Sequence, residues 1–190
     1  MDINYILRLL TLTLLVIWRI YWFVHTKEAA IKKPKTNNDP RIIEKIYSLL
    51  AAAYVLINLL GFVIFSFNNL PIQIFGFILV ILGFFEGVSA RKILDANWTE
   101  SFEYQIKEKH ELITKGIYKY VRHPIYGGIL IMVNGALILA GNYTVILYFL
   151  IMFLVIESYA RREEKLLTKH FGMKYVEYMK STKKFIPFVY

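Results

Sequence analysis

The sequence predicts an all-α integral membrane protein with five transmembrane helices. The first observation is composition: 57% of the 190 residues are hydrophobic and only 19% are charged, whereas soluble domains are roughly 45 to 50% apolar. The second is that the apolar residues form long runs, which raise the mean hydropathy to +0.46. The third is that basic residues gather in the polar stretches between these runs, as they do on the cytoplasmic side of membrane proteins.

The five apolar runs are the candidate membrane spans. They cover residues 3–24, 42–67, 72–89, 125–140 and 143–159. An α-helix rises about 1.5 Å per residue, so the first run can cross a hydrocarbon core of about 30 Å. The last two are short for a full crossing, which takes about 17 to 25 residues, unless residues at the interface extend them.

Polar side chains inside the runs have ordinary structural explanations. Arg19 can reach the lipid headgroups with its long side chain, and Arg8, near the other end of the same run, needs no special role. Asn58 and Asn134 are expected to form hydrogen bonds between helices. Glu86 is an ionisable group in or near lipid, which indicates either function or a buried partner.

The basic residues predict how the chain is oriented. Six Lys and Arg lie in residues 27–45, seven in residues 91–122 and eight in residues 161–184, with none in the two tight turns. The positive-inside rule then places the N-terminus outside and the C-terminus in the cytoplasm of a multi-pass cell-membrane protein. The net charge of +9 does not indicate nucleic acid as a partner, because no basic recognition helix or zinc finger is present.

The stretch from His110 to Gly128, HELITKGIYKYVRHPIYGG, concentrates the candidate chemistry of this single 1–190 domain. It holds two of the four histidines, three tyrosines and Arg122 within nineteen residues. Pro124 lacks a backbone N–H and disfavours helical geometry at His123. We therefore expect Arg-His-Pro to form a turn at the start of a span, with side chains that can point into a pocket. The catalytic part is predicted to cover about residues 90–190.

Several familiar kinds of site are excluded. The HExxH spacing is missing, so no metal is predicted. No GxSxG motif, cysteine or GxGxxG motif is present, which argues against a nucleophilic serine or thiol and against a soluble dinucleotide site. What remains is a set of tyrosines and carboxylates suited to a positive centre, and of Arg122 and histidines suited to a negative one. Such a set fits a zwitterionic ligand.

A second charged group stands at the end of the fifth run. On a helix Glu157 and Arg161 are four residues apart and form a favourable pair, and Glu164 lies on the same face. Glu163 stands beside them. The alternative explanation is a solvated helix start with surface salt bridges, which would contribute little.

These residues give the sequence a family resemblance. The matching positions are His110-Glu-Leu-Ile, Gly116, Tyr118, Arg122-His-Pro-Ile-Tyr126, Glu163-Glu164, Leu167, Phe171-Gly172, Tyr175 and Tyr178. They make the chain resemble the isoprenylcysteine carboxyl methyltransferase family, as a small prokaryotic member of it. The resemblance covers about the last half of the chain, and the first two runs match only in being hydrophobic.

The resemblance implies an S-adenosylmethionine-dependent membrane methyltransferase, which releases S-adenosylhomocysteine and methylates a lipophilic or prenylated acceptor at a carboxylate. The acceptor would enter from the lipid bilayer, and the cofactor from a cytoplasmic pocket formed by segment 100–126 and the C-terminal helix. The implied cofactor-binding residues are Tyr104, His110, Glu111, Leu112, Ile113, Tyr118, His123, Pro124, Ile125, Tyr126 and Glu163, with Glu103 as a weaker candidate beside Tyr104. The candidate catalytic residues are Glu163, Arg122 and Arg161.

One position departs from the family pattern. The family has an arginine one helical turn before the glutamate that matches Glu163, and this chain has Tyr159 there. Arg161 or Arg162 could substitute for it. N-methylation of a phospholipid head group therefore stays open as an alternative, as do a sterol-type reductase and a non-catalytic membrane scaffold.

Overall fold

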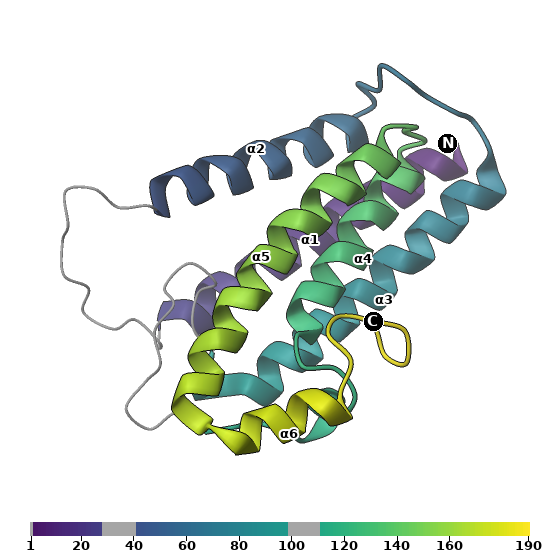
Figure 1. Cartoon of the computed structure of the whole chain (residues 1–190). Helices are drawn as coiled ribbons and strands as arrows, with labels where there is room; N and C mark the ends of the chain where they lie inside the picture. The colour runs from purple at the N-terminus through teal and green to yellow at the C-terminus, as the bar shows by residue number, and fades with distance from the viewer. Residues whose placement is uncertain (1, 28–40, 99–110) are drawn as a thin grey trace. The chain divides into compact units, whose positions relative to one another are not determined.

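The computed structural model describes residues 2–27, 41–98 and 111–190. Within these ranges the chain is helical, without a β-strand (Figure 1). The helices are α1 (Ile3–Lys27), α2 (Arg41–Leu59), α3 (Leu70–Leu94), α4 (Pro124–Leu139), α5 (Val145–Phe171) and α6 (Met173–Ser181). Two short 3₁₀ turns, Asp95–Asn97 and Gly116–Lys119, follow α3 and precede α4. The predicted all-α class is confirmed.

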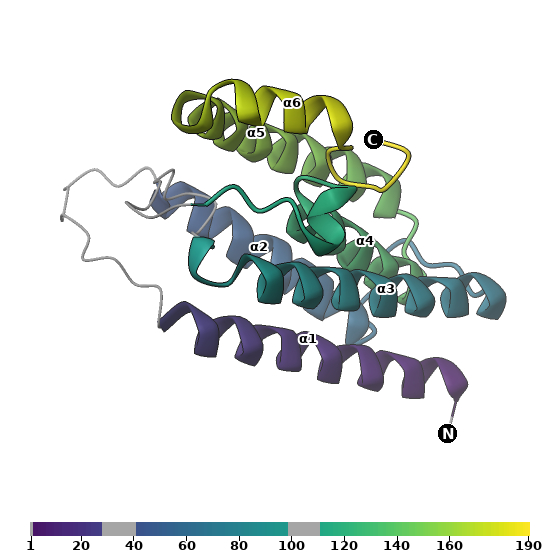
Figure 2. The ribbon, with the colours of Figure 1, turned by 90° about the horizontal axis from the view of Figure 1, so that it is seen from below.

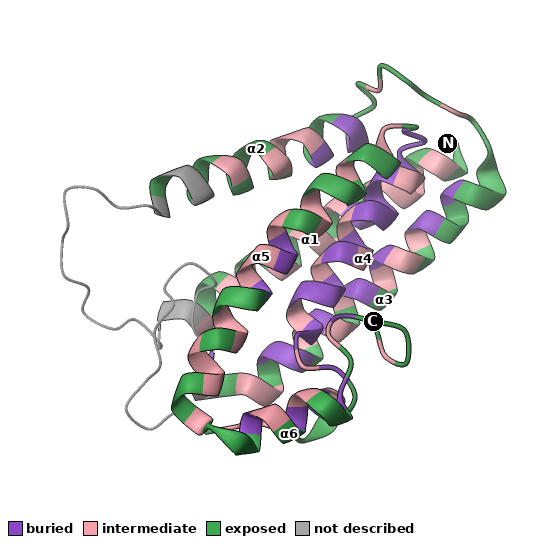
Figure 3. Cartoon of the chain, viewed as in Figure 1, coloured by how far each residue is buried: buried purple, intermediate pink, exposed green. Residues whose placement is uncertain are grey.

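Two helices are long and apolar enough to cross a membrane by length and composition. They are Ile3–His25 within α1, and Leu70–Leu94, which is all of α3. The apolar parts of α2 (Lys45–Leu59) and α4 (Pro124–Leu139) are shorter. Large apolar side chains are exposed along α1, α2 and α5, as lipid contact requires, whereas α4 has no exposed residue (Figure 3).

Two of the helices end at other residues than the predicted runs. The second run, 42–67, is helical only as far as Leu59, because the chain turns at Gly61 with φ +100° and the apolar residues beyond it form an irregular connection. The third run, 72–89, belongs to a helix that continues to Leu94, since the Ala-Arg-Lys sequence at its end favours a helix. The fifth run is the first half of α5, which extends without interruption into the polar region. The predicted break at Gly172 is confirmed.

The chain forms two compact units. The first comprises Met1–Val80 and Val133–Ile146, and the second comprises Ile81–Met132 and Leu147–Tyr190. In the first unit Asn142 donates a hydrogen bond of 2.5 Å to the side chain of Asn58, so Asn58 bonds to the turn between α4 and α5 rather than to another helix. Arg8 donates to the carbonyl oxygen of Ala140 at 2.9 Å, so this arginine has a structural partner that the sequence did not predict.

The second unit contains the residues that the sequence singled out. Its core is formed by Tyr126 and Leu130 of α4, Ile156 and Ala160 of α5, and Phe185 of the segment after α6. The second half of α3 lies close to α4, because a Cβ on Gly83 or Gly128 would meet the backbone of the other helix. These contacts fix the start of α4 against α3 and α5.

The chain that follows α6 returns to the start of α4 (Figure 2). The N–H groups of Arg122 and His123 donate to the carbonyl oxygens of Lys183 and Lys184, both at 2.9 Å. This pairing holds Arg-His-Pro at a bend outside the helix, in agreement with the predicted turn, with Pro124 as the first residue of α4. Proline suits that position, because its missing N–H would have no partner within the helix.

Candidate functional site

The candidate site lies in the second unit, where three segments meet. The first segment runs from Tyr118 to Tyr126, the second is the middle of α5 from Glu157 to Glu164, and the third is α6 with the chain after it. The pairing of Arg122 and His123 with the returning chain directs their side chains toward α5. The local backbone therefore positions the cations, and α5 supplies the carboxylates.

His123 is buried between two carboxylates of α5. Its Nδ1 lies 3.5 Å from Oε2 of Glu163, and its Nε2 lies 3.3 Å from Oε1 of Glu164. A neutral imidazole donates from only one nitrogen, so carboxylates at both nitrogens favour the imidazolium. Burial alone would lower the pKa of His123, but its hydrogen bonds with Glu163 and Glu164 raise the pKa overall. The ring also stacks on Tyr126, with centroids 5.5 Å apart.

Glu164 is the centre of the charged group. Its Oε1 accepts a hydrogen bond of 2.5 Å from Nε of Arg122, whose Nη1 also donates to the carbonyl oxygen of Thr182 at 2.9 Å. Burial disfavours the charged carboxylate, but the hydrogen bonds from His123 and Arg122 outweigh burial and lower the pKa of Glu164 to about 2. This carboxylate is therefore ionised at neutral pH and holds both cations in place.

Lys184 links the two ends of the charged segment of α5. Its Nζ lies 2.8 Å from Oε1 of Glu157 and 3.5 Å from Oε2 of Glu164. Glu157 also accepts a hydrogen bond of 2.7 Å from Nε of Arg161, so the predicted pair four residues apart is confirmed. The Arg161 side chain is 69% exposed, whereas those of Lys184 and Glu157 are 11% and 8% exposed.

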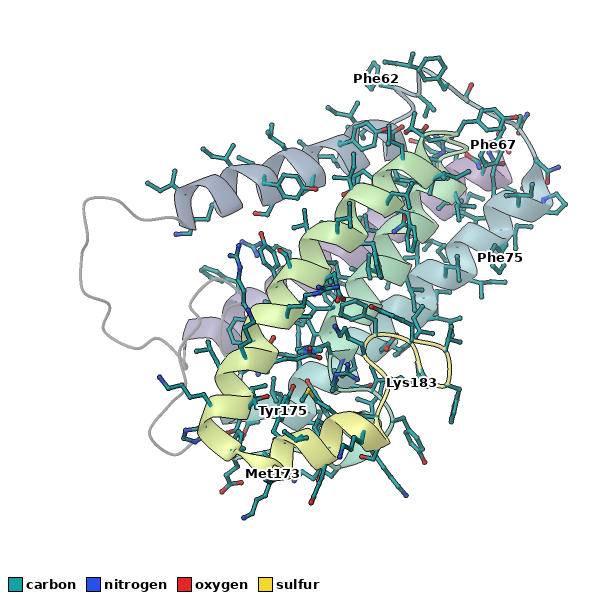
Figure 4. The ribbon with its side chains drawn as sticks, viewed as in Figure 1. Phe62, Phe67, Phe75, Met173, Tyr175 and Lys183 are labelled. Carbon is teal, nitrogen blue, oxygen red and sulfur yellow. The ribbon has the colours of Figure 1, made fainter. Side chains whose placement is uncertain are left out.

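Three tyrosines surround the carboxylates. The hydroxyl of Tyr178 donates to the carbonyl oxygen of Tyr118 at 2.7 Å, which fixes the 3₁₀ turn against α6. Burial, and then the negative charge of Glu163, raise the pKa of Tyr118 well above its usual value. The buried hydroxyl of Tyr175 has no hydrogen-bond partner among the described residues. Figure 4 shows Tyr175 and the exposed Met173, both on α6.

The remaining predicted cofactor-binding residues lie on both sides of the 3₁₀ turn. Tyr104 and His110, with Glu103, fall outside the described residues. Glu111 is exposed, and its backbone N–H donates to the side chain of Asn97 at 2.7 Å. Beyond it, Leu112 and Ile113 are half-buried, as is Ile125, while Pro124 is fully buried.

The structure brings some of the predicted residues together and separates others. His123, Arg122 and Glu163 form one cluster around Glu164, whereas Arg161 pairs with Glu157. The sequence did not predict a role for Lys184, because it is one of several basic residues near the end of the chain that look alike in the sequence. It also assigned no role to Glu164 beyond a place on the helix face. Nothing local in the sequence distinguishes either residue.

The described cluster carries three carboxylates and three permanent cations in addition to His123. The carboxylates are Glu157, Glu163 and Glu164, and the cations are Arg122, Arg161 and Lys184. Because the cluster presents charges of both signs, it can receive a ligand that itself carries both signs. Among the described residues no group of His, Asp and Glu is arranged to hold a metal ion.

Comparison with known proteins supports a methyltransferase. The model of the phospholipid methyltransferase family matches residues 71–174. Protein-S-isoprenylcysteine O-methyltransferase B of Arabidopsis thaliana is 29% identical over 177 residues, which cover 88% of this chain and 89% of that protein. The A form of the same plant is 33% identical over 120 residues, covering 60% of this chain and 59% of that protein.

A solved structure has a similar fold. The eukaryotic intramembrane Ras methyltransferase, isoprenylcysteine carboxyl methyltransferase, is 21% identical with a TM-score of 0.59, and the match covers 81% of this chain and 55% of that one. The chain thus spans about half the length of that structure. The predicted resemblance to isoprenylcysteine carboxyl methyltransferases is confirmed, and this membrane methyltransferase belongs to the phospholipid methyltransferase family.

Proposed function

We propose that this methyltransferase transfers a methyl group from S-adenosylmethionine to the carboxylate of a prenylated or otherwise lipophilic acceptor. The observation that carries the proposal is His123, whose two ring nitrogens face the carboxylates of Glu163 and Glu164 at the start of the apolar helix α4. This arrangement places fixed charges of both signs at the start of an apolar helix. The acceptors named for the similar plant proteins are isoprenylcysteines.

The residues present fit S-adenosylmethionine. The cofactor carries a sulfonium and an amino acid group, so it needs a carboxylate, a cation and aromatic surface. Glu163 offers a carboxylate that is 41% exposed, and Arg122 offers a cation held nearby through Glu164. The buried Tyr175 hydroxyl, unpartnered among the described residues, provides a further hydrogen-bonding group; burial, and then the negative charges of Glu164 and Glu163, raise its pKa.

The reaction requires no strong acid or base from the protein. When bound, S-adenosylmethionine would supply a methyl group on a positively charged sulfur; an acceptor carboxylate would take this methyl as one C–O bond forms and one C–S bond breaks, and S-adenosylhomocysteine would leave. No proton has to be removed from a carboxylate, so positioning and desolvation carry the catalysis. Tyr126 and His123 present stacked rings, and Glu163 attracts positive charge.

Arg161 is the cation that we assign to the acceptor carboxylate. Arg122 and Lys184 are largely buried against Glu164 and Glu157, whereas the Arg161 side chain is mostly exposed. It can therefore exchange its contact with Glu157 for an acceptor without leaving a buried charge unpaired. This role would replace the family arginine that is missing at Tyr159.

The topology forms part of the proposal. We infer five membrane crossings, with the N-terminus outside and the site facing the cytoplasm. The support comes from the two long apolar helices, the two shorter ones, the apolar first half of α5 and the concentration of basic residues in the site segments. The cofactor would enter from the cytoplasm, and the acceptor laterally from the bilayer.

The decisive experiment is calorimetric titration of the detergent-purified protein with S-adenosylhomocysteine, the expected product. We expect saturable binding that His123→Ala and Tyr126→Ala remove while the protein stays folded by circular dichroism. Tyr143→Ala, which changes an exposed aromatic residue of the first unit, is the matched control and should bind normally. Absence of binding in the folded wild-type protein would refute the assignment of this cofactor.

The second candidate activity is N-methylation of a phospholipid head group. The observation that favours it is the phospholipid methyltransferase model, which spans residues 71–174 and so includes Glu163. An amine must lose a proton before or during methylation, and Glu163 would then serve as the base. A panel of prenylcysteines and phosphatidylethanolamine with labelled S-adenosylmethionine separates the two activities. Label in the lipid alone would overturn the carboxylate assignment.

A further inference from the structure

The returning chain after α6 forms a basic and aromatic cavity on the second unit. The cavity has a volume of about 540 Å³ and is lined by the end of α6, the returning chain and residues just before α4. Its cationic side chains are Arg122, Lys180, Lys183 and Lys184, and no acidic side chain lines it. The charge of this cavity is therefore suited to an anion.

Two of these lysines differ from the other cations. Arg122 and Lys184 are committed to Glu164 and Glu157, and they belong to the site already described. Lys180 and Lys183 are exposed, on α6 and on the chain that follows it, where Figure 4 labels Lys183. Their ammonium groups are thus available to a ligand that approaches from outside the protein.

Exposed apolar side chains stand beside the lysines. Phe188 is 81% exposed and Val189 is 70% exposed, although neither lies on a membrane-spanning helix. Phe188 packs on Tyr120, with ring centroids 5.9 Å apart, and its backbone lies in the left-handed region at φ +66°. Aromatic residues flanked by lysines are typical of the interface between lipid headgroups and acyl chains.

The position of the cavity also points to a membrane. Tyr120 and Arg122 line it, and α4 begins two residues later at Pro124. The start of an apolar helix is where the headgroup layer is expected, and backbone hydrogen bonds tie the returning chain to that point.

We propose that this cavity, which we call the Lys180–Lys183 site, binds the phosphate of an anionic phospholipid, with Phe188 and Val189 inserted among the lipids. The commitment to lipid rather than free phosphate rests on the exposed aromatic side chains, which an inorganic ion would leave in water. The two lysines that carry the proposal lie outside the cofactor and acceptor site, although Arg122 and Lys184 of that site also line the cavity.

The test is native mass spectrometry of the delipidated full chain, titrated with phosphatidylglycerol or phosphatidylcholine of identical acyl chains. The wild-type protein should prefer phosphatidylglycerol. Each lysine near an anionic surface contributes about fivefold in affinity, so Lys180→Gln/Lys183→Gln should weaken phosphatidylglycerol binding by roughly ten- to thirty-fold and leave phosphatidylcholine binding unchanged. The matched control is Lys165→Gln/Lys169→Gln, which changes the same charge at exposed positions of α5 and should keep the preference.

Further variants distinguish the alternatives. Lys180→Arg/Lys183→Arg should retain the preference, and Phe188→Gly, which also relieves the positive φ, should weaken binding of both lipids. Excess inorganic phosphate should not displace the lipid. Equal affinity of the wild-type protein for the two lipids would overturn the proposal. So would a preference that survives Lys180→Gln/Lys183→Gln, an equal loss in the α5 control, or displacement by phosphate.

Discussion

The ammonium group of Lys184 lies 2.8 Å from Oε1 of Glu157, a residue 27 positions earlier in the chain. This ion pair joins the returning chain after α6 to the end of the apolar half of α5. Lys184 also lies 3.5 Å from Glu164, which in turn holds Arg122 and His123. A single buried cation thus connects the end of the candidate span with the histidine of the site.

We predict that Lys184→Met lowers the stability of the protein by about 3 kcal/mol, because it leaves the buried carboxylate of Glu157 with only an exposed partner. The measurement is the midpoint of thermal unfolding in detergent. The control is Glu157→Gln/Lys184→Met, which removes both charges and should recover part of the loss. If Lys184→Met unfolds at the wild-type temperature, this pair has no structural role.

Arg161→Ala should weaken binding of the acceptor without lowering the stability of the protein. The Arg161 side chain is 69% exposed, so its removal should leave the unfolding temperature nearly unchanged. If Arg161 holds the acceptor carboxylate, KM for a prenylcysteine should rise roughly tenfold with a smaller change in kcat. Arg162→Ala, at the exposed neighbouring position, is the matched control. A KM that stays at the wild-type value would remove Arg161 from the acceptor site.

Glu163 and Glu164 are neighbours in α5 with different environments, and their variants should differ. Glu164→Gln should lower the unfolding temperature, since Arg122 loses the carboxylate that it contacts and the buried His123 keeps only Glu163. Glu163→Gln should leave that temperature nearly unchanged, because Glu163 is 41% exposed. It should weaken S-adenosylhomocysteine binding roughly tenfold. The opposite pattern would exchange the roles of the two carboxylates.

The ion pairs also predict how stability varies with pH. The pKa of Glu164 is lowered from 4.5 to about 2, so its contribution is present above pH 4.5 and is lost as the pH falls toward 2. The pKa of His123 is raised above 6.5, so its contribution is complete below pH 6.5 and is lost as the pH rises through the raised value.

The measurement for this prediction is the unfolding temperature across the two ranges. Glu164→Gln should make the unfolding temperature depend less on pH in the acid range than it does in the wild-type protein. His123→Gln should do the same in the alkaline range. An alkaline slope that is unchanged in His123→Gln would show that another group titrates there.

The parts of the site that follow local rules could be predicted from the sequence. The non-helical turn into α4 follows from the steric effect of Pro124 on His123, and the Glu157–Arg161 pair follows from helical spacing. Contacts between distant segments could not. His123 and Glu164 are 41 residues apart, and their meeting depends on how the chain after α6 returns to α4.

The ends of the helices also depend on contacts that the sequence could not predict. Residues 60–67 are as apolar as a membrane span, and for this reason they were included in the predicted second run. In the structure they form an irregular connection. There the N–H of Phe67 donates to Gly141 and that of Tyr143 to Phe65, contacts that hydropathy cannot predict. Composition identifies an apolar segment, but the partners of its backbone groups decide whether it is helical.

Arg8 and Arg19 provide the last prediction, because the two arginines of α1 look equivalent in the sequence. Arg8 donates to the carbonyl oxygen of Ala140 just beyond the end of α4, and to that of Asn58 in the last turn of α2. Carbonyl oxygens at a helix end have no partner within the helix and favour a cation. One guanidinium therefore satisfies two helix ends in the first unit.

Arg8→Leu should consequently cost about 2 to 3 kcal/mol, since hydrogen bonds to a charged group are each worth about 1.5 to 3 kcal/mol. Arg19→Leu is the matched control, because it removes the same charge from an exposed position of the same helix. Unfolding in a mixed-detergent titration measures both variants. If the two substitutions lower stability equally, the effect belongs to the charge of α1 rather than to the bonds that Arg8 makes with Ala140 and Asn58.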